Sequence, residues 1–194
     1  MIKTLFLASI LIVFGACTTR LLSGNGLEGS STIGNPFTAF AVAKYDDVNG
    51  LTVCMDQMTL EDVNGKTVKV PFALGKETVI PPTGVDLKSL SVPSGQYTKI
   101  SLNLADVCGT GRTLVVNNDQ GTFKTSSPLV LKFVGNNFLG SGNQKIIFDL
   151  QLTADNLSDV QSDSEVANQA QADTGNYYSS SCGMQTNSSV AAFC

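Results

Sequence analysis

The sequence lacks histidine and tryptophan altogether, and charged residues make up only 14% of its 194 residues. Without histidine, the usual general base near neutral pH and the commonest metal ligand are missing, which excludes Ser-His-Asp and Cys-His catalytic sites. Without tryptophan, the aromatic platform typical of carbohydrate-binding β-sandwiches is missing. The formal net charge of −4 excludes the basic surface of a nucleic-acid-binding protein. Together, these absences favour a protein that is not an enzyme.

The first 16 residues have the three parts of a secretory signal. Lys3 provides a positive charge, residues 5–14 are apolar, and Gly15-Ala16 are the small residues expected at a cleavage site. An apolar run of this length is too short to cross a bilayer as a mature helix. We therefore expect residues 1–16 to be removed, which leaves 178 residues, enough for one domain with a buried core.

The residue after this signal is a cysteine. The segment Phe14-Gly15-Ala16-Cys17 resembles the lipobox of bacterial lipoproteins, with Phe14 where those proteins usually have Leu, Val or Ile. The resemblance implies that the Cys17 thiol is diacylated and that Cys17 becomes the N-terminus. Thr18 follows, rather than the Asp that retains lipoproteins in the inner membrane, which implies an outer-membrane location. The alternative is an ordinary signal with an unmodified Cys17, but its flank lacks the Ala-x-Ala form.

The chain contains five cysteines, an odd number that needs an explanation in an exported protein. If Cys17 carries lipid, four remain: Cys54, Cys108, Cys182 and Cys194. Three connectivities are possible, and proximity in the sequence favours Cys54–Cys108 with Cys182–Cys194, each bond stabilising by roughly 3–4 kcal/mol. The alternative is that Cys54 and Cys108 are free, buried thiols. None of the four has the spacing of a metal site, so we expect neither a metal nor a cofactor.

Composition divides the exported chain into three parts. Residues 17–35 are rich in glycine, serine and threonine, which predicts a flexible tether. Residues 36–153 hold short apolar runs separated by turn residues, and we expect them to form the folded domain. Residues 154–194 are polar and acidic, which predicts a weakly structured tail with a weak helix over 156–172 and an exposed Tyr177-Tyr178 pair.

The apolar runs of the central part have the pattern of strands. No stretch keeps a 3.6-residue period, whereas Tyr97–Leu104 alternates apolar and polar residues cleanly. Turn residues recur about every ten positions, which is typical of an all-β, antiparallel sandwich. We expect about 7–9 strands in it.

Two Asn-Gly pairs predict the first sheet. Asn49-Gly50 and Asn64-Gly65 each lie between apolar runs, and Asn-Gly is favoured in two-residue hairpin turns because both residues accept a positive φ. The pairs predict a meander of three consecutive strands, over 37–44, 51–60 and 67–74.

One segment of this domain resembles a known family. Ser91-Val92-Pro93-Ser94-Gly95-Gln96-Tyr97-Thr98-Lys99-Ile100-Ser101-Leu102 is similar to a segment of the DUF4382-type bacterial lipoproteins. Gly95, Tyr97 and Thr98 match, and Leu129-Val130-Leu131-Lys132-Phe133 fits loosely. The resemblance implies a turn into a central strand of a transthyretin-like or carboxypeptidase-regulatory-like sandwich. The family has no assigned activity, so only fold and location are implied.

Carboxylate pairs are the remaining candidates for catalysis. Asp46-Asp47 and Glu61-Asp62 each lie beside an Asn-Gly pair, where solvated turn residues are common, whereas a glycosidase needs two convergent acids in a cleft. Asp47-x-Asn49-Gly50 is part of a calcium-loop pattern but lacks the preceding Asp and the terminal Glu. A G-x-G-x-x-G spacing in the tether lacks the flanking strand and helix of a dinucleotide site; it comprises Gly24, Gly26 and Gly29.

We therefore interpret the chain as a non-enzymatic, lipid-anchored protein of the cell envelope, a binding or structural β-sandwich module at the outer membrane. Its expected partners are the membrane, through the lipid on Cys17, and an envelope protein, with no nucleic acid. One alternative is a fimbrillin-like fibre or adhesin subunit whose edge strands recruit a neighbour. Another is a carboxylate-dependent hydrolase. The sequence leaves the oligomeric state open.

Overall fold

A computed structural model describes residues 35–43, 48–72, 74–138 and 144–181, which form twelve strands and two short helices. In chain order these are β1 (Asn35–Val42), β2 (Val48–Val53), β3 (Met55–Asp62), β4 (Thr67–Pro71), β5 (Thr78–Ile80), β6 (Val85–Val92), β7 (Tyr97–Leu104), β8 (Leu114–Asn118), β9 (Gly121–Thr125), β10 (Leu129–Phe138), β11 (Gln144–Asp149), α1 (Gln151–Ser158), α2 (Asp163–Ala170) and β12 (Thr174–Ser181). The all-β class predicted from the sequence is confirmed.

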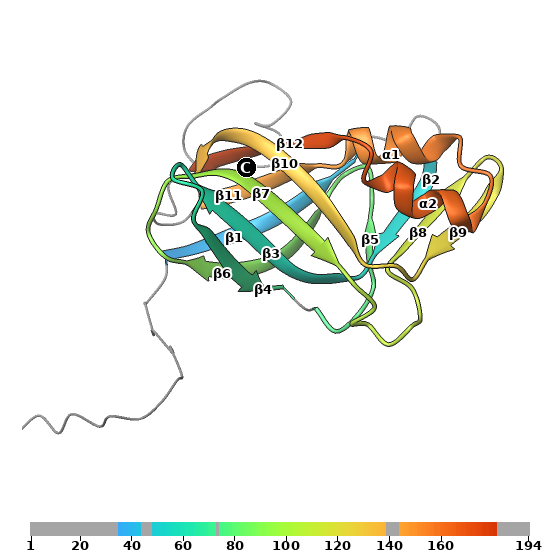
Figure 1. Ribbon diagram of the computed structural model, residues 1–194, viewed down its shortest axis with the longest axis horizontal. Coiled ribbons are helices and arrows are strands. Elements are labelled where there is room, and N and C mark those ends of the chain that lie inside the picture. Colours follow the sequence, from blue (N-terminus) through green and yellow to red (C-terminus); the bar gives the residue numbers. More distant parts are fainter. Residues whose placement is uncertain (1–34, 44–47, 73, 139–143, 182–194) are drawn as a thin grey trace, which may run out of the picture. The chain divides into compact units, whose positions relative to one another are not determined.

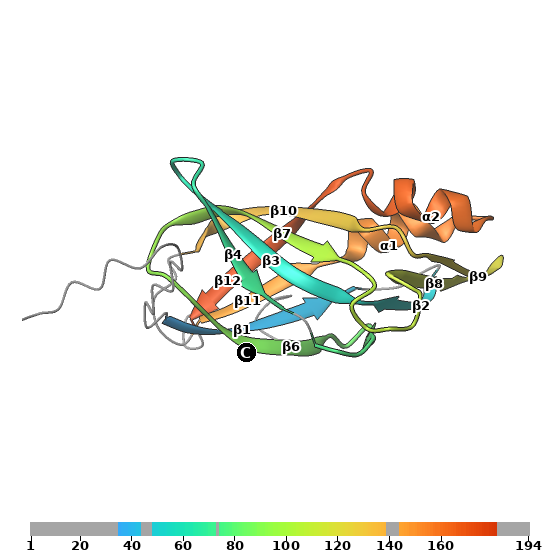
Figure 2. The same cartoon turned by 60° about the horizontal axis from the view of Figure 1, so that its bottom comes forward.

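The strands form one large and one small sheet (Figure 1). The large sheet has the order β4-β3-β7-β10-β12-β11-β1-β6, and the small sheet has the order β5-β2-β8-β9. The large sheet curls until its edge strands β4 and β6 come into contact (Figure 2). Two of its pairs, β1 with β11 and β10 with β12, are parallel. The large sheet is therefore mixed rather than purely antiparallel as expected, and each parallel pair joins strands that are not consecutive in the sequence.

The core lies between the inward faces of these strands. On β7, Ile100, Leu102 and Leu104 are buried and the residues between them face outward, as the alternation predicts. The rings of Phe133 and Phe148 meet edge to face at 5.2 Å between centroids. Burial of each such side chain stabilises the fold by about 1.5–3 kcal/mol.

The predicted meander is wrong at its first turn. Asn49-Gly50 lies inside β2, where Gly50 pairs with Asn117 of β8, and a register shift at this point marks a β-bulge. The apolar run over 51–60 then leaves the small sheet at Cys54 and continues in the large sheet as β3. β1 pairs with β6 and β11 instead of β2. The β-bulge accommodates Asn49-Gly50 within a continuous strand. Long-range strand pairing therefore outweighs the local preference of Asn-Gly for a turn.

The second turn is confirmed, with a longer loop than expected. β3 and β4 pair antiparallel, and the N–H of Asp62 donates to the carbonyl of Lys66 (2.9 Å), which leaves a three-residue loop. Gly65 has a φ of 80°, as expected at the third position of such a loop. The Asp62 carboxylate accepts hydrogen bonds from the N–H groups of Asn64 and Lys66, each at 2.8 Å, and so holds the loop closed.

The two Asn-Gly glycines should respond differently to the same substitution. We expect Gly65→Val to lower the free energy of unfolding by about 1–3 kcal/mol, because valine is strained at positive φ. Gly50→Val should change it by no more than about 0.5 kcal/mol, because Gly50 has an ordinary φ and no atom within 4 Å of an added Cβ. Urea denaturation of both variants measures the difference, and equal losses would contradict the assignment of the turns.

The folded part continues beyond residue 153. Helix is present near the predicted range 156–172, but as two short helices, α1 beginning earlier at Gln151 and α2 ending at Ala170, and β12 then lies between β10 and β11. The expected start of the weakly structured tail at residue 154 is thereby corrected, since described structure extends to residue 181. β12 is polar in composition, but its backbone groups are paired on both sides, and Gly175 and Tyr177 face inward. The amino-acid composition of a segment gives no information about such strand pairing.

Asn118 joins the helices to the small sheet. Its side-chain amide is buried, at 3% exposure, and donates to the carbonyls of Leu157 (3.1 Å), Ser158 (2.9 Å) and Val160 (3.0 Å). Its side-chain carbonyl accepts the N–H groups of Gln120 and Gly121 in the β8–β9 turn. One side chain thus ends α1 and closes a hairpin.

Candidate functional site

The structure tests one of the two predicted cysteine pairs. Cys54 and Cys108 are joined by a disulfide, with their Cα atoms 6.0 Å apart, so this pairing is confirmed and the free-thiol alternative is wrong. Cys17, Cys182 and Cys194 lie outside the described residues, and their predicted lipid attachment and pairing stay predictions.

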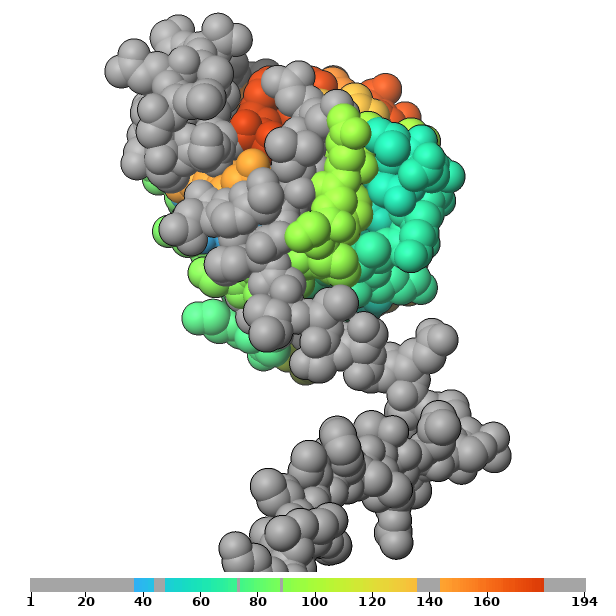
Figure 3. All heavy atoms as spheres, turned by 90° about the vertical axis from the view of Figure 1, so that its left-hand side faces the viewer, coloured from blue at the N-terminus to red at the C-terminus, as the bar shows by residue number. Residues whose placement is uncertain are grey.

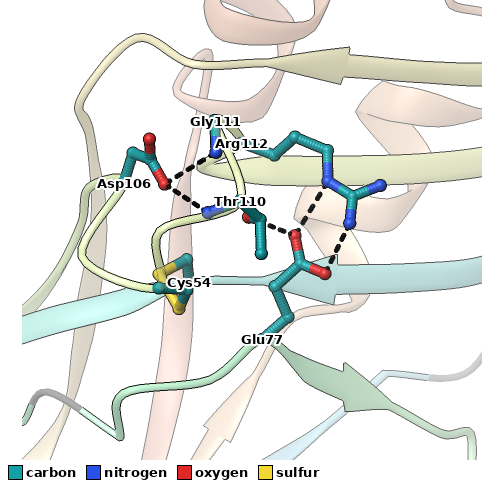
Figure 4. The surroundings of a disulfide bond; sticks show 7 residues. Cys54, Glu77, Asp106, Thr110, Gly111 and Arg112 are labelled. Carbon is teal, nitrogen blue, oxygen red and sulfur yellow. Dashed lines mark hydrogen bonds and ion pairs between the residues drawn. A yellow bond between two sulfur atoms is a disulfide. The ribbon is translucent and has the colours of Figure 1, made fainter.

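The disulfide holds the loop between β7 and β8 against the point where β2 becomes β3 (Figure 4). Within this loop, the Asp106 carboxylate accepts the N–H groups of Thr110 and Gly111. The Glu77 carboxylate, just before β5, accepts Nε (2.9 Å) and Nη2 (2.8 Å) of Arg112 and the Thr110 hydroxyl (2.8 Å). These acidic groups are acceptors in a structural network rather than a convergent acid pair.

The predicted carboxylate pairs do not converge either. Glu61 forms an ion pair with Lys99 at 2.7 Å, while Asp62 closes the β3–β4 loop. Asp46 and Asp47 lie outside the described residues, as do the three tether glycines. Of the calcium-loop pattern, Asn49 is described, and its amide donates to the Asp119 carboxylate at 3.2 Å.

The Gly-x-Tyr motif at 95–97 has a structural role. The Tyr97 hydroxyl donates to the carbonyl of Pro93 at 2.8 Å, so the ring folds back over its own turn. A Cβ at Gly95 would lie only 3.1 Å from the Tyr97 ring, which explains the glycine. The tip of the β3–β4 hairpin contacts this turn, because the N–H of Val63 donates to the carbonyl of Gln96. In Figure 3 the hairpin is teal and lies beside the green segment that leads into β7.

Tyr177, expected to be exposed, is 1% exposed and donates its hydroxyl to the carbonyl of Tyr97 at 3.1 Å. Its neighbour Tyr178 is 37% exposed on the outer face. Burial raises the pKa of Tyr177 to about 12. Burial, with a smaller contribution from the Asp62 carboxylate, also raises the pKa of Tyr97. Both tyrosines therefore serve the fold rather than an exposed binding surface.

We expect the protein to lose stability at high pH because of Tyr177. Between its ordinary pKa near 10 and about 12, the folded protein keeps the phenol proton that the unfolded chain releases. Rising pH therefore favours unfolding, and the contribution present below pH 10 is lost as pH passes about 12. The free energy of unfolding, measured by urea denaturation at pH 9 and pH 11, should fall less between these two pH values in Tyr177→Phe than in the wild type. Tyr97 contributes to the fall that remains in the variant. Tyr178→Phe, the control, should lose as much as the wild type.

The outer face of the large sheet gathers lysines on neighbouring strands. One row of outward side chains crosses β4, β3, β7, β10 and β12 and consists of Lys69, Thr59, Ser101, Lys132 and Thr174. In the adjacent row, Glu61 of β3 lies opposite Lys99 of β7. We call these residues the lysine face; β3, β7 and β10 run side by side in Figure 1. With strands about 4.8 Å apart, the row is about 19 Å long.

The lysine face is open and positively charged. A shallow hollow of about 400 Å³ lies over it, lined by both partners of the Lys99–Glu61 ion pair and by Lys132. The side chain of Lys99 is 60% exposed despite this ion pair. Lys69 and Lys132 are exposed, and neither has an ion-pair partner in the part of the chain that the structure describes. A chain of net charge −4 thus presents a locally cationic surface.

Reasoning from the sequence did not find the lysine face. The alternation in Tyr97–Leu104 shows that Lys99 and Ser101 point outward, and the same holds for Lys132 on its own strand. The register that aligns these strands comes from pairing between residues such as Lys132 and Ser101, which are distant in the chain. The signal in the sequence that could have indicated this face was the presence of lysines at outward-facing positions of several predicted strands.

A second hollow, of about 280 Å³, lies between the helices and is lined by Asp155, Asp159 and Glu165 among others. Glu165 accepts the N–H of Gln161. Within the described ranges, no three Cys, Asp or Glu side chains are grouped to hold a metal ion. Nor does any described helix have the length and apolarity to cross a membrane.

Comparison with known proteins adds one structural likeness. No protein-family model matches the chain, and no curated protein matches it. Among solved structures, the chain is similar to a protein from Eubacterium rectale determined by NMR, with 10% sequence identity, a TM-score of 0.23, and coverage of 79% of this chain and 93% of that chain. A likeness at this TM-score carries no argument about function.

Proposed function

We propose that the protein is a non-enzymatic binding module, attached to the bacterial outer membrane by lipid on Cys17. The observation that carries this proposal is the Cys54–Cys108 disulfide. Disulfides form and persist mainly in exported proteins, which agrees with the secretory signal at residues 1–16. The bond also accounts for two of the five cysteines and supports a separate chemistry for Cys17 at the end of that signal.

Binding is better supported than catalysis because the carboxylates beside the lysine face and around the disulfide already have structural partners. Glu61 pairs with Lys99, Glu77 pairs with Arg112, and Asp62 and Asp106 hold loops. A general acid or base needs a carboxylate that is free to exchange a proton with a substrate. The lysine face, in contrast, presents accessible polar groups on rigid strands. A relationship to the DUF4382-type lipoproteins is part of this proposal, supported by the structural roles of Gly95 and Tyr97.

The fimbrillin-like alternative requires a free sheet edge that recruits a neighbour. The edge strands of the large sheet, β4 and β6, contact each other, β5 at one edge of the small sheet has only three residues, and β9 at its other edge packs against α2. These observations favour a binding module over a fibre subunit. Oligomer ladders in mild detergent would favour the fibre subunit instead.

Mass spectrometry of the protein purified from envelopes tests the anchor. We expect an acylated Cys17 as the first residue, and we expect the Cys17→Ala variant to leave the outer-membrane fraction, because several acyl chains are needed for stable anchoring. Cys182→Ala/Cys194→Ala is a control that removes other cysteines, leaves the Cys54–Cys108 bond intact and should keep the membrane location. An unmodified Cys17 would contradict the proposal.

A further inference from the structure

The spacing of the lysines on the lysine face bears on the kind of ligand it binds, because their positive charges are spread along a line across the strands. Lys69 and Lys132 lie in one row but three strands apart, a separation of about 14 Å. Side chains on a sheet stand roughly perpendicular to it, and with strands this far apart two such side chains hold their ammonium groups too far apart to share a single small anion such as phosphate. A polymer that carries a negative charge at intervals can contact both, and Lys99 in the adjacent row adds a third ammonium group beside Lys132.

The groups between the lysines are suited to sugars. Thr59, Ser101 and Thr174 place hydroxyl groups in the same row as Lys69 and Lys132, and hydroxyls both donate to and accept from sugar hydroxyls. On β10, Val130 and Val134 flank Lys132 on the same face and are 39% and 42% exposed. Such apolar patches can contact the C–H faces of sugar rings. Charge pairs and these contacts would replace the tryptophan platform that the chain lacks.

An anionic membrane surface fits the lysine face less well. Segments that bind anionic lipids typically gather about four to eight basic residues, whereas this face has three lysines and the carboxylate of Glu61. We therefore propose that the lysine face binds an acidic polysaccharide, a polymer of sugars that carry carboxylates, lying across β4, β3, β7, β10 and β12. This inference rests on the proposed binding function and names its ligand class.

The purified full-length protein in detergent can be tested on immobilised polygalacturonate, with polyglutamate and neutral dextran as comparison polymers. We expect binding to polygalacturonate that weakens as salt is raised, weaker binding to polyglutamate, and none to dextran. The double variant Lys99→Gln/Lys132→Gln should bind polygalacturonate about tenfold more weakly. Lys76→Gln/Lys124→Gln, which changes the net charge equally at exposed positions outside the face, should bind like the wild type.

Glu61→Gln gives an effect of opposite sign, which loss of folding cannot produce. It frees Lys99 from its ion pair and removes the one carboxylate of the face, so binding should become about threefold tighter. Equal binding of polyglutamate, displacement by glycerophosphoglycerol as effective as by oligogalacturonate, or an unchanged double variant would each overturn the proposal, the first two in favour of an acidic polypeptide or a lipid surface. Because the assay does not depend on the anchor, its failure is distinct from a failure of the Cys17 test.

Discussion

Removing the Cys54–Cys108 bond should lower the free energy of unfolding by about 4 kcal/mol. The two cysteines are 54 positions apart, and chain entropy predicts a stabilisation of about this size for a closed loop of that length. The bond also holds the loop that carries Arg112, so its loss should loosen the contact between Arg112 and Glu77, which lies just before β5. Urea denaturation of Cys54→Ala/Cys108→Ala, compared with the wild type, measures the effect.

Two controls separate this bond from the other cysteines. Reductant should destabilise the wild type and leave Cys54→Ala/Cys108→Ala nearly unchanged. The variant Cys182→Ala/Cys194→Ala should keep most of the stability and all of the sensitivity to reductant that the Cys54–Cys108 bond confers. If reductant affected the first variant as much as the wild type, the stabilising bond would have to be a different one.

Asn118→Ala should cost about 3 kcal/mol of unfolding free energy. The substitution leaves three carbonyls at the end of α1 and two N–H groups of the β8–β9 turn without their buried partner. Asn117, the preceding residue on β8, is exposed, so Asn117→Ala is the matched control and should cost less than about 0.5 kcal/mol. Thermal unfolding followed by circular dichroism compares the two. Equal losses would show that Asn118 does not hold the helices in place.

Sequence reasoning succeeded where a residue's role depends on its near neighbours. The alternation in Tyr97–Leu104 predicted both the bounds and the buried side of β7, and the turn at Asn64-Gly65 follows from local chemistry. The Cys54–Cys108 pairing could be predicted because the cysteine count leaves few alternatives. In each case the competing arrangements were few.

Sequence reasoning failed where distant strands compete. Asn49-Gly50 is a strong turn signal, but β2 pairs with β8 and β5, and a bulge absorbs the glycine. Tyr177 belongs to a segment that is polar in composition, yet its neighbours on β10 and β11 bury it. The lysine face depends on the same long-range register. No local pattern contains this information, because it resides in the pairing of strands.

The central place of β12 has a consequence for the order of assembly. β10 and β11 do not pair with each other, since β12 lies between them. Until residue 181 has been synthesised, the large sheet can exist only as two pieces, β4-β3-β7-β10 and β11-β1-β6, each with an open edge. Such edges are prone to pair with other chains. The large sheet is therefore completed late, when β12 inserts, and a chain truncated before Thr174 would be left with two aggregation-prone half-sheets.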